Sequence, residues 1–192
     1  MKSLDASVRV PPEERSLTQP VAQPAGESAP WPPVPGARAS LSRCDDIRRA
    51  ALDLTCAAQR SLALFSAALE PAVFDRPALL EAVAVLARRR RARLRILVRD
   101  PRYVMARGHG LVELARRLST TIELRRPHPR HRNGTEQLLV TDEAGLLFRP
   151  TELRCEGWAF LYAPVEARRR LRFFDAMWSL AEPDPELQRL YL

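Results

Sequence analysis

Polar residues flank a short apolar run in the second half of the chain, Thr135-Glu136-Gln137-Leu138-Leu139-Val140-Thr141-Asp142. Thr135 offers a hydroxyl, Gln137 an amide and Asp142 a carboxylate at the first, third and last positions of this octet. A threonine hydroxyl becomes a nucleophile only when a base takes its proton, and an amide has no charge to offset a developing anion. The octet therefore offers polar groups at both ends of an apolar run, but neither an activated nucleophile nor a positive charge.

Two arginine clusters also have recognisable chemistry. The formal net charge is +8, and Lys2 is the only lysine among 31 basic residues. Arginine bonds phosphate in a bidentate way, so nucleic acid or another phosphate-containing ligand is a candidate partner. The candidate anion-binding residues precede the octet: Arg125, Arg126, His128, Arg130, His131 and Arg132. The other cluster, residues 88–107, has nine arginines against one aspartate, and such runs are commonly solvated faces.

Metal and cofactor signatures are missing from the sequence. No H-E-x-x-H run and no His, Asp or Glu cluster at ligand spacing is present. There is also no P-loop, G-x-S-x-G or G-x-G-x-x-G motif. The sequence therefore predicts no metal site and no cofactor.

The three cysteines, Cys44, Cys56 and Cys155, form no C-x-x-C pair and indicate neither a disulfide framework nor a zinc site. Cys56 falls on the apolar face of a predicted helix, so we expect it to pack in the core. This cysteine usage predicts a reducing, cytoplasmic location. No apolar run approaches the roughly 20 residues that a membrane helix needs, which predicts no membrane insertion.

Hydrophobic periodicity predicts alternating helices and strands from about residue 42 onward. Helices are expected near 45–58, 77–86, 108–118 and 164–178. Strands are expected at 61–67, 94–98, 121–125, 137–141, 146–149 and 158–162. This alternation predicts an α/β fold with helices on the faces of one sheet. The hairpin that turns at residues 142–145 predicts a mixed sheet.

Residues 1–41 form a proline-rich tail that we predict to be disordered, ahead of a folded domain at 42–192. Eight of the 17 prolines fall in this tail. No apolar periodicity survives there, so the segment cannot bury enough surface to offset its ordering entropy. Trp31-Pro32-Pro33-Val34-Pro35 is either a polyproline motif that docks a protein partner or part of a spacer.

The order of elements around the octet resembles the phospholipase D superfamily, over one repeat from about 45 to 180. Its H-x-K-x-x-x-x-D signature has the octet's frame, with Thr135 at the histidine nucleophile, Gln137 at the phosphate-binding lysine and Asp142 at the aspartate. Leu97-Val98-Arg99-Asp100-Pro101 and Glu182-Pro183-Asp184-Pro185-Glu186-Leu187 are also similar to an uncharacterised proteobacterial domain. That domain is sometimes found C-terminal to acyltransferase-like domains.

Further departures from the active superfamily follow the octet. The register of its G-S-x-x-N element reads Arg149-Pro150-Thr151-Glu152-Leu153. Active members also combine two such sites in one centre, whereas one repeat is present here. The resemblance therefore implies a pseudoenzyme whose arginine loop borders the former phosphodiester pocket.

Three functional hypotheses follow. The leading one is a non-catalytic phospholipase D-like domain that binds a phosphate-containing ligand or nucleic acid through the 125–132 loop. The second is a protein-interaction module that docks a partner through its tail, with the face around Trp178 as a surface for a homodimer. The third is a residual phosphodiesterase that uses His128 or His131, for which geometry matters before pKa.

Overall fold

The computed structural model describes residues 31, 34, 36–131, 134–184 and 187. The predicted tail up to residue 30, and Arg132 of the candidate anion-binding loop, lie outside the described residues. The three prolines of the Trp31 motif, Pro32, Pro33 and Pro35, also lie outside them.

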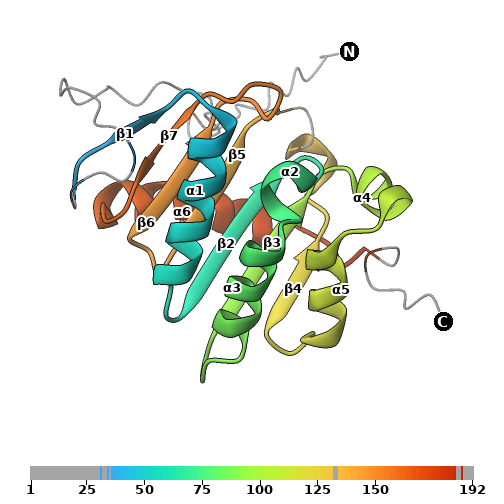
Figure 1. The fold of residues 1–192 in the computed structure, drawn as a ribbon. Coiled ribbons are helices and arrows are strands. Elements are labelled where there is room, and N and C mark those ends of the chain that lie inside the picture. Colours follow the sequence, from blue (N-terminus) through green and yellow to red (C-terminus); the bar gives the residue numbers. More distant parts are fainter. Residues whose placement is uncertain (1–30, 32–33, 35, 132–133, 185–186, 188–192) are drawn as a thin grey trace, which may run out of the picture.

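Seven strands form one mixed sheet in the order β1-β7-β6-β5-β2-β3-β4 (Figure 1). The strands are β1 (Ala39–Leu41), β2 (Ser61–Ser66), β3 (Arg93–Val98), β4 (Ile122–Arg125), β5 (Gln137–Thr141), β6 (Gly145–Arg149) and β7 (Gly157–Phe160). Strands β2, β3 and β4 are parallel, and the other pairings are antiparallel. The α/β fold and the mixed sheet predicted from the sequence are therefore confirmed.

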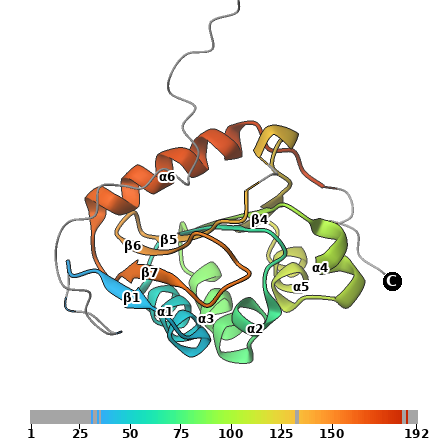
Figure 2. The ribbon, with the colours of Figure 1, turned by 90° about the horizontal axis from the view of Figure 1, so that it is seen from above.

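Helices cover both faces of the sheet (Figure 2). One face carries α6 (Pro164–Ser179). The opposite face carries α1 (Cys44–Ala57), α2 (Pro71–Phe74), α3 (Pro77–Ala87), α4 (Pro101–Arg107) and α5 (Gly110–Arg117). A short 3-10 helix, η1 (Pro129–His131), lies in the connection between β4 and β5.

Two apolar clusters, one on each side of the sheet, form the core. Leu62, Leu64 and Ile96 belong to the cluster shared with α1, α3 and α5. Phe65, Leu97 and Phe174 belong to the cluster under α6. Because side chains alternate along a strand, consecutive residues of β2 and β3 supply both clusters, which explains why these strands read as continuous apolar runs.

A buried histidine begins α5. His109 Nδ1 accepts a hydrogen bond from the Leu111 amide at 3.1 Å, and its Nε2–H donates to the Leu69 carbonyl at 2.8 Å. Burial lowers the pKa of His109 below its ordinary value, against the opposing effects of Asp75 and the Leu69 carbonyl. The neutral ring is therefore a helix cap and a bridge to the loop after β2.

Two predictions about the cysteines are wrong: that they form no disulfide and that Cys56 packs in the core. Cys44 and Cys155 form a disulfide across a sequence separation of 111 residues, and Cys56 is exposed. Spacing missed the bond because Cys44 at the start of α1 and the loop before β7 meet only in the fold, with Cα atoms 4.8 Å apart. Cys56 lies near the end of α1, beyond Thr55, the last buried residue of that helix.

Strand β1 begins within the segment expected to be disordered. Ala39 and Leu41 are buried, and β1 pairs antiparallel with β7. Trp31 is partly buried as well, and its indole Nε1–H donates to Asp53 Oδ2 of α1 at 2.9 Å. A three-residue strand is too short for hydrophobic periodicity to reveal.

Candidate functional site at the ends of β2 and β5

The octet runs the length of β5 and places its polar residues at opposite ends of that strand. Gln137 begins β5 and Asp142 directly follows it. Because β5 is antiparallel to β2, with Phe65 opposite Leu138 and Leu62 opposite Thr141, Gln137 lies near the end of β2 and Asp142 near its start. At about 3.3 Å per residue, the two ends of β5 are on the order of 15 Å apart, so the structure does not bring Asp142 to Gln137.

Asp142 holds a turn of the chain. Its carboxylate accepts hydrogen bonds from three consecutive backbone amides: Gln59 at 2.6 Å, Arg60 at 2.8 Å and Ser61 at 2.8 Å. These amides connect α1 to β2. Asp142 itself lies in the left-handed region, with φ of 50°, which aspartate tolerates better than most residues.

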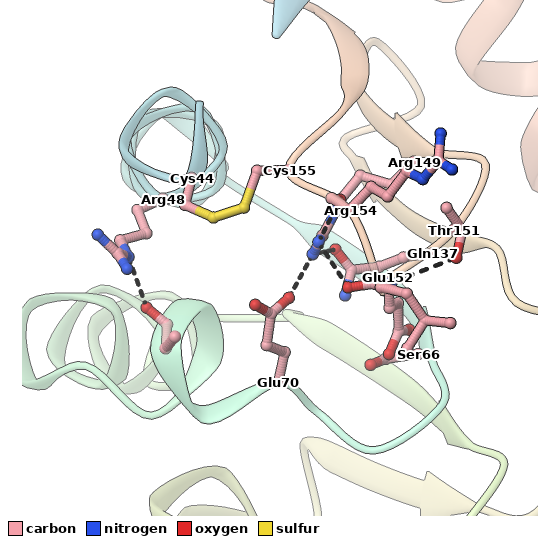
Figure 3. A network of polar contacts seen from close by, with 12 residues as sticks. Cys44, Arg48, Ser66, Glu70, Gln137, Arg149, Thr151, Glu152, Arg154 and Cys155 are labelled. Carbon is pink, nitrogen blue, oxygen red and sulfur yellow. Dashed lines mark hydrogen bonds and ion pairs between the residues drawn. A yellow bond between two sulfur atoms is a disulfide. The ribbon is translucent and has the colours of Figure 1, made fainter. Parts of the chain in front are cut away.

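Gln137 contacts a buried arginine. Its Oε1 accepts a hydrogen bond from Arg149 Nη1 at 3.1 Å, and Arg149 is the residue opposite it on β6. Arg149 Nη2 donates to the carbonyls of Glu152 and Arg154, each at 2.9 Å. Arg149 Nη1 also forms an ion pair with Glu70 Oε2. Figure 3 shows Glu70, Gln137 and Arg149 converging, with the Cys44–Cys155 disulfide to one side.

A second buried arginine lies beside this group. Arg99, directly after β3, stacks over the Phe65 ring at 4.7 Å and donates from Nη2 to the Glu136 carbonyl at 2.8 Å. Its guanidinium also faces the carboxylates of Glu136, at 3.7 Å, and Glu152, at 3.9 Å. Glu152 Oε1 in turn accepts the Ala67 amide at 2.6 Å, which joins this arginine to the loop after β2. We call the set Arg99, Glu136, Glu152, Arg149, Glu70 and Gln137 the buried ion network.

The buried ion network compensates its own charge. Burial raises the pKa of Glu152, while the Ala67 amide, Ser66, Arg99 and Arg149 act in the opposite direction. Burial lowers the pKa of Arg99, which Glu136 and Glu152 oppose. Two guanidinium groups face three carboxyl groups, so the network offers no surplus positive charge to an incoming phosphate. No histidine belongs to it.

The side chain of Thr135 has no bond to a side chain of this network. It is exposed, and its hydroxyl donates to the Pro150 carbonyl at 3.2 Å. Its own carbonyl accepts the Glu152 amide at 2.9 Å, which ties the octet to the loop that follows β6. The hydroxyl has no base among the partners that the described residues give it.

Two arginines of the candidate anion-binding loop are paired with acids. Arg125 Nη2 lies 3.0 Å from Glu123 Oε2, and its guanidinium stacks on Trp178 at 4.5 Å. Arg126 lies 3.8 Å from Asp184, and its backbone bridges to Glu182. The structure therefore gives these two side chains structural contacts on the α6 side of the sheet.

The exposed tip of the same loop carries the remaining described residues. His128 and Arg130 are exposed, and Arg130 Nε donates to His131 Nε2 at 3.0 Å. His128 Nδ1 accepts the Arg130 amide at 3.4 Å. The two histidines thus contact Arg130 of η1, whereas Thr135 and Gln137 are bonded to Pro150 and Arg149.

Sequence reasoning missed the buried ion network. Arg99, Glu136, Arg149 and Glu152 were not singled out as site residues, although each lies next to an apolar strand segment. The sequence feature that could have revealed the network is a charged side chain directly beside an apolar strand segment. In the fold these positions meet where β2, β3, β5 and β6 converge. Burial of an ion pair requires its partners to be nearby, and those partners come from distant parts of the chain.

Metal and membrane features do not emerge from the described part of the chain. Within it, no group of three or more His, Cys, Asp and Glu side chains is placed to hold a metal ion. Its helices are all too short or too polar to cross a membrane.

Solved structures share this fold. TrmBL2, an archaeal chromatin protein with a novel mode of DNA binding, matches with a TM-score of 0.57 and 13% identity, over 77% of this chain and 54% of that one. Nuc from Salmonella typhimurium, a phospholipase D family member, matches with a TM-score of 0.51 and 14% identity, over 71% of this chain and 90% of Nuc. NucT from Helicobacter pylori matches with a TM-score of 0.51 and 8% identity, over 77% and 98% of the two chains.

These likenesses establish a phospholipase D-like fold. This chain spans about half the length of the archaeal protein, 54%, and nearly the whole length of Nuc and NucT. No curated protein matches it in sequence. The family model described as "Domain of unknown function (DUF7931)" matches residues 43–190, most of the chain, and the protein therefore belongs to that family.

Proposed function

We propose that this protein is a non-catalytic phospholipase D-like domain that binds the phosphate backbone of nucleic acid. The observation that carries the first half of the proposal is the buried ion network. Gln137 stands at the lysine position of the resembled signature, and its amide is bonded to an arginine that a carboxylate already neutralises.

The chemistry of the octet supports the loss of phosphoryl transfer. Thr135 is a poor substitute for a histidine nucleophile, and its hydroxyl is bonded to a carbonyl rather than to a base. Removal of a nucleophile alone lowers the rate of an enzyme by several orders of magnitude. The nearest histidines, His128 and His131, contact Arg130 instead.

Charge and fold support the second half. The net charge of +8 is carried almost wholly by arginine, which suits contacts to phosphate. TrmBL2, which shares the fold, is described as binding DNA. Arginine contacts to the backbone give affinity without sequence specificity, so we expect binding to many sequences.

A hydrolysis assay tests the loss of catalysis. Wild-type protein, His128→Ala and His131→Ala are incubated with bis(p-nitrophenyl) phosphate and with end-labelled DNA and RNA oligonucleotides. We expect no turnover above buffer in any of the three. Turnover by the wild type that either histidine variant abolishes would establish a residual phosphodiesterase and overturn this half of the proposal.

A salt titration tests the binding. Fluorescence anisotropy of a labelled 20-base-pair DNA duplex and of a single strand is measured against protein from low to moderate salt. Binding through arginine–phosphate contacts should weaken steeply, with a log–log slope of about −0.9 for each contact on duplex DNA. Micromolar protein that shifts neither probe at low salt would refute nucleic-acid binding.

Docking of a protein partner on the tail would break a contact that Trp31 makes with the folded domain. The indole is bonded to Asp53 of α1 and packs against the core, so a partner that captures it must first displace this contact. Co-purification of a partner that is lost on deletion of residues 1–30, a cut that leaves Trp31 in place, would favour a tail-docked module.

A further inference from the structure

The connection between α3 and β3 is a run of arginines at one end of the sheet. Arg88, Arg89, Arg90 and Arg91 follow α3, and Arg93 begins β3. Arg60, directly before β2, lies alongside, because the Arg93 amide donates to the Arg60 carbonyl at 2.8 Å. All six side chains are exposed. We call Arg60, Arg88, Arg89, Arg90, Arg91 and Arg93 the arginine turn.

The arginine turn lies away from the buried ion network. It is at the amino-terminal ends of β2 and β3, whereas the network is at their carboxyl-terminal ends. In Figure 1 the α3–β3 connection is at the lower end of the sheet, and α2 marks the upper end. The turn is therefore a surface separate from the buried ion network.

Backbone hydrogen bonds fix the shape of the turn. The Arg88 amide donates to Ala84, the Arg89 amide to Leu86 and the Ala92 amide to Arg89, and Ala92 is buried beneath. Arg91 has a φ of 66°, a left-handed conformation that favours glycine and that costs a residue with a side chain about 1 kcal/mol. Arginine occupies this position in spite of the cost.

Asp142 holds the backbone next to the arginine turn. Its carboxylate binds the amides of Gln59, Arg60 and Ser61, and Gln59 Oε1 accepts a hydrogen bond from Arg89. The last residue of the octet thus helps to position Arg60 and Arg89.

The charge of the arginine turn is not compensated. None of its six guanidinium groups forms an ion pair within the described residues. The carboxylates nearby have other partners: Asp175 pairs with Arg95, Glu123 with Arg125, and Glu143 with Arg168. The Asp142 carboxylate is bonded to three backbone amides and to no guanidinium group of the turn. A cluster of like charges without counter-ions is unfavourable for the free protein, and an anionic partner would relieve it.

A groove of about 630 Å³ begins beside the turn on the α6 face of the sheet. Arg93 and the hydroxyl residues Ser61, Thr120 and Thr121 line the part next to the turn. Three carboxylates, Glu123, Glu143 and Asp175, also line the groove, and each is paired with an arginine outside the turn. Hydroxyl groups and arginines are the usual donors to phosphate oxygens. The groove therefore continues the turn with a surface of suitable chemistry.

We infer that the arginine turn is the surface that contacts the phosphodiester backbone of nucleic acid. The inference rests on the proposed function and adds the site. Nucleic acid is favoured over an anionic membrane because residues 88–93 offer no large apolar side chain for insertion into a bilayer, and Val85 of α3 is a single exposed apolar residue beside them. The paired state of Arg125 and Arg126 makes the turn a better contact than the 125–132 loop.

Matched charge variants test the site. Arg88→Gln, Arg90→Gln and Arg93→Gln are combined in one protein, which leaves Arg89 bonded to Gln59 and Arg91 in its turn. The control combines Arg102→Gln, Arg169→Gln and Arg172→Gln, three exposed arginines of α4 and α6 without an ion pair among the described residues. Both variants lose the same charge, and thermal unfolding and circular dichroism verify that both are folded.

The probe is the 20-base-pair DNA duplex, titrated with salt. We expect the turn variant to bind at least about tenfold more weakly and to lose about 2 to 3 units of the log–log salt slope, since each backbone contact contributes about 0.9. The control should change affinity less than threefold. Equal weakening of both variants would show a diffuse charge effect and overturn the site.

The same experiment separates the two proposals. A wild-type protein that binds no nucleic acid removes the proposed function along with the site. A wild-type protein that binds, with a turn variant that binds equally well, removes only the site. Sedimentation with vesicles of phosphatidylcholine and phosphatidylserine is run in parallel, and turn-dependent capture by vesicles without DNA binding would overturn the choice of nucleic acid.

Discussion

Gln137 shows how the buried ion network excludes the residue type that the resembled signature has at this position. Its amide oxygen is 3.1 Å from Arg149 Nη1, and both side chains are almost fully buried. A lysine at this position would put an ammonium group against a guanidinium group where water cannot screen the repulsion.

Gln137→Lys should therefore destabilise the fold. We expect the free energy of unfolding in urea to fall by about 2–4 kcal/mol, because the lysine loses the hydrogen bond from Arg149 and buries a second cation directly beside it. Gln137→Met, which loses the hydrogen bond but adds no charge, should cost only about 1 kcal/mol. A lysine variant as stable as the methionine variant would contradict this picture of the network.

Asp142 has a structural role that does not depend on the residues at the other two signature positions, Thr135 and Gln137. Its three amide partners belong to the α1–β2 connection and to no part of the network. The aspartate has an architectural contact that is independent of chemistry at the other end of β5.

At the scale of elements, α5 depends on the neutral form of His109. Burial lowers the pKa of this ring below 6.5, so the folded state binds the proton less tightly than the unfolded chain does. The stability that the neutral ring contributes is full above pH 6.5 and is lost as pH falls below it toward the lowered pKa. Protonation would also remove the acceptor that caps Leu111.

His109→Asn is the variant that tests this element. Asparagine caps helices well but does not titrate, so its free energy of unfolding should vary less between pH 5 and pH 8 than that of the wild type. His109→Ala should cost about 1–2 kcal/mol at pH 8 through the lost cap. Urea unfolding at several pH values measures both, and parallel curves for wild type and asparagine variant would refute the role of the ring.

Elements with long apolar patterns could be predicted from the sequence. Strand β5 and helix α6 were placed to within a residue or two because each carries a continuous hydrophobic signal. Strand β1 and helices α2 and α4 were missed because a piece of three to seven residues is set by its tertiary contacts.

The site was less accessible to sequence reasoning than the fold. The octet's position and its unusual residues are visible in the sequence, but the other members of the buried ion network are not. Arg149, Glu70 and Arg99 come from three separate segments, and only the folded sheet brings them together.

At the scale of the whole molecule, the Cys44–Cys155 disulfide determines how many free thiols the protein has. Alkylation with iodoacetamide in denaturant without reductant should label Cys56 alone, and prior reduction should allow three labels. Intact mass spectrometry counts the labels. Three labels without reductant would show that the bond is absent from the isolated protein.

Reduction should also lower stability. Closing a loop of about 100 residues stabilises the folded state by roughly 4–5 kcal/mol in the chain-entropy account. A Cys44→Ser/Cys155→Ser variant measured beside the reduced wild type separates the loss of the bond from any effect of the reductant.

The disulfide also determines the result of a single proteolytic cleavage between the two cysteines. Strands β2 to β6 all lie between Cys44 and Cys155, so they belong to one covalently closed circle. A protease that cleaves once at the exposed Arg130 would open the chain without releasing a fragment. The nicked protein would migrate as one species until a thiol reagent separated it into two, and the two pieces could stay paired through the β2–β5 ladder even then.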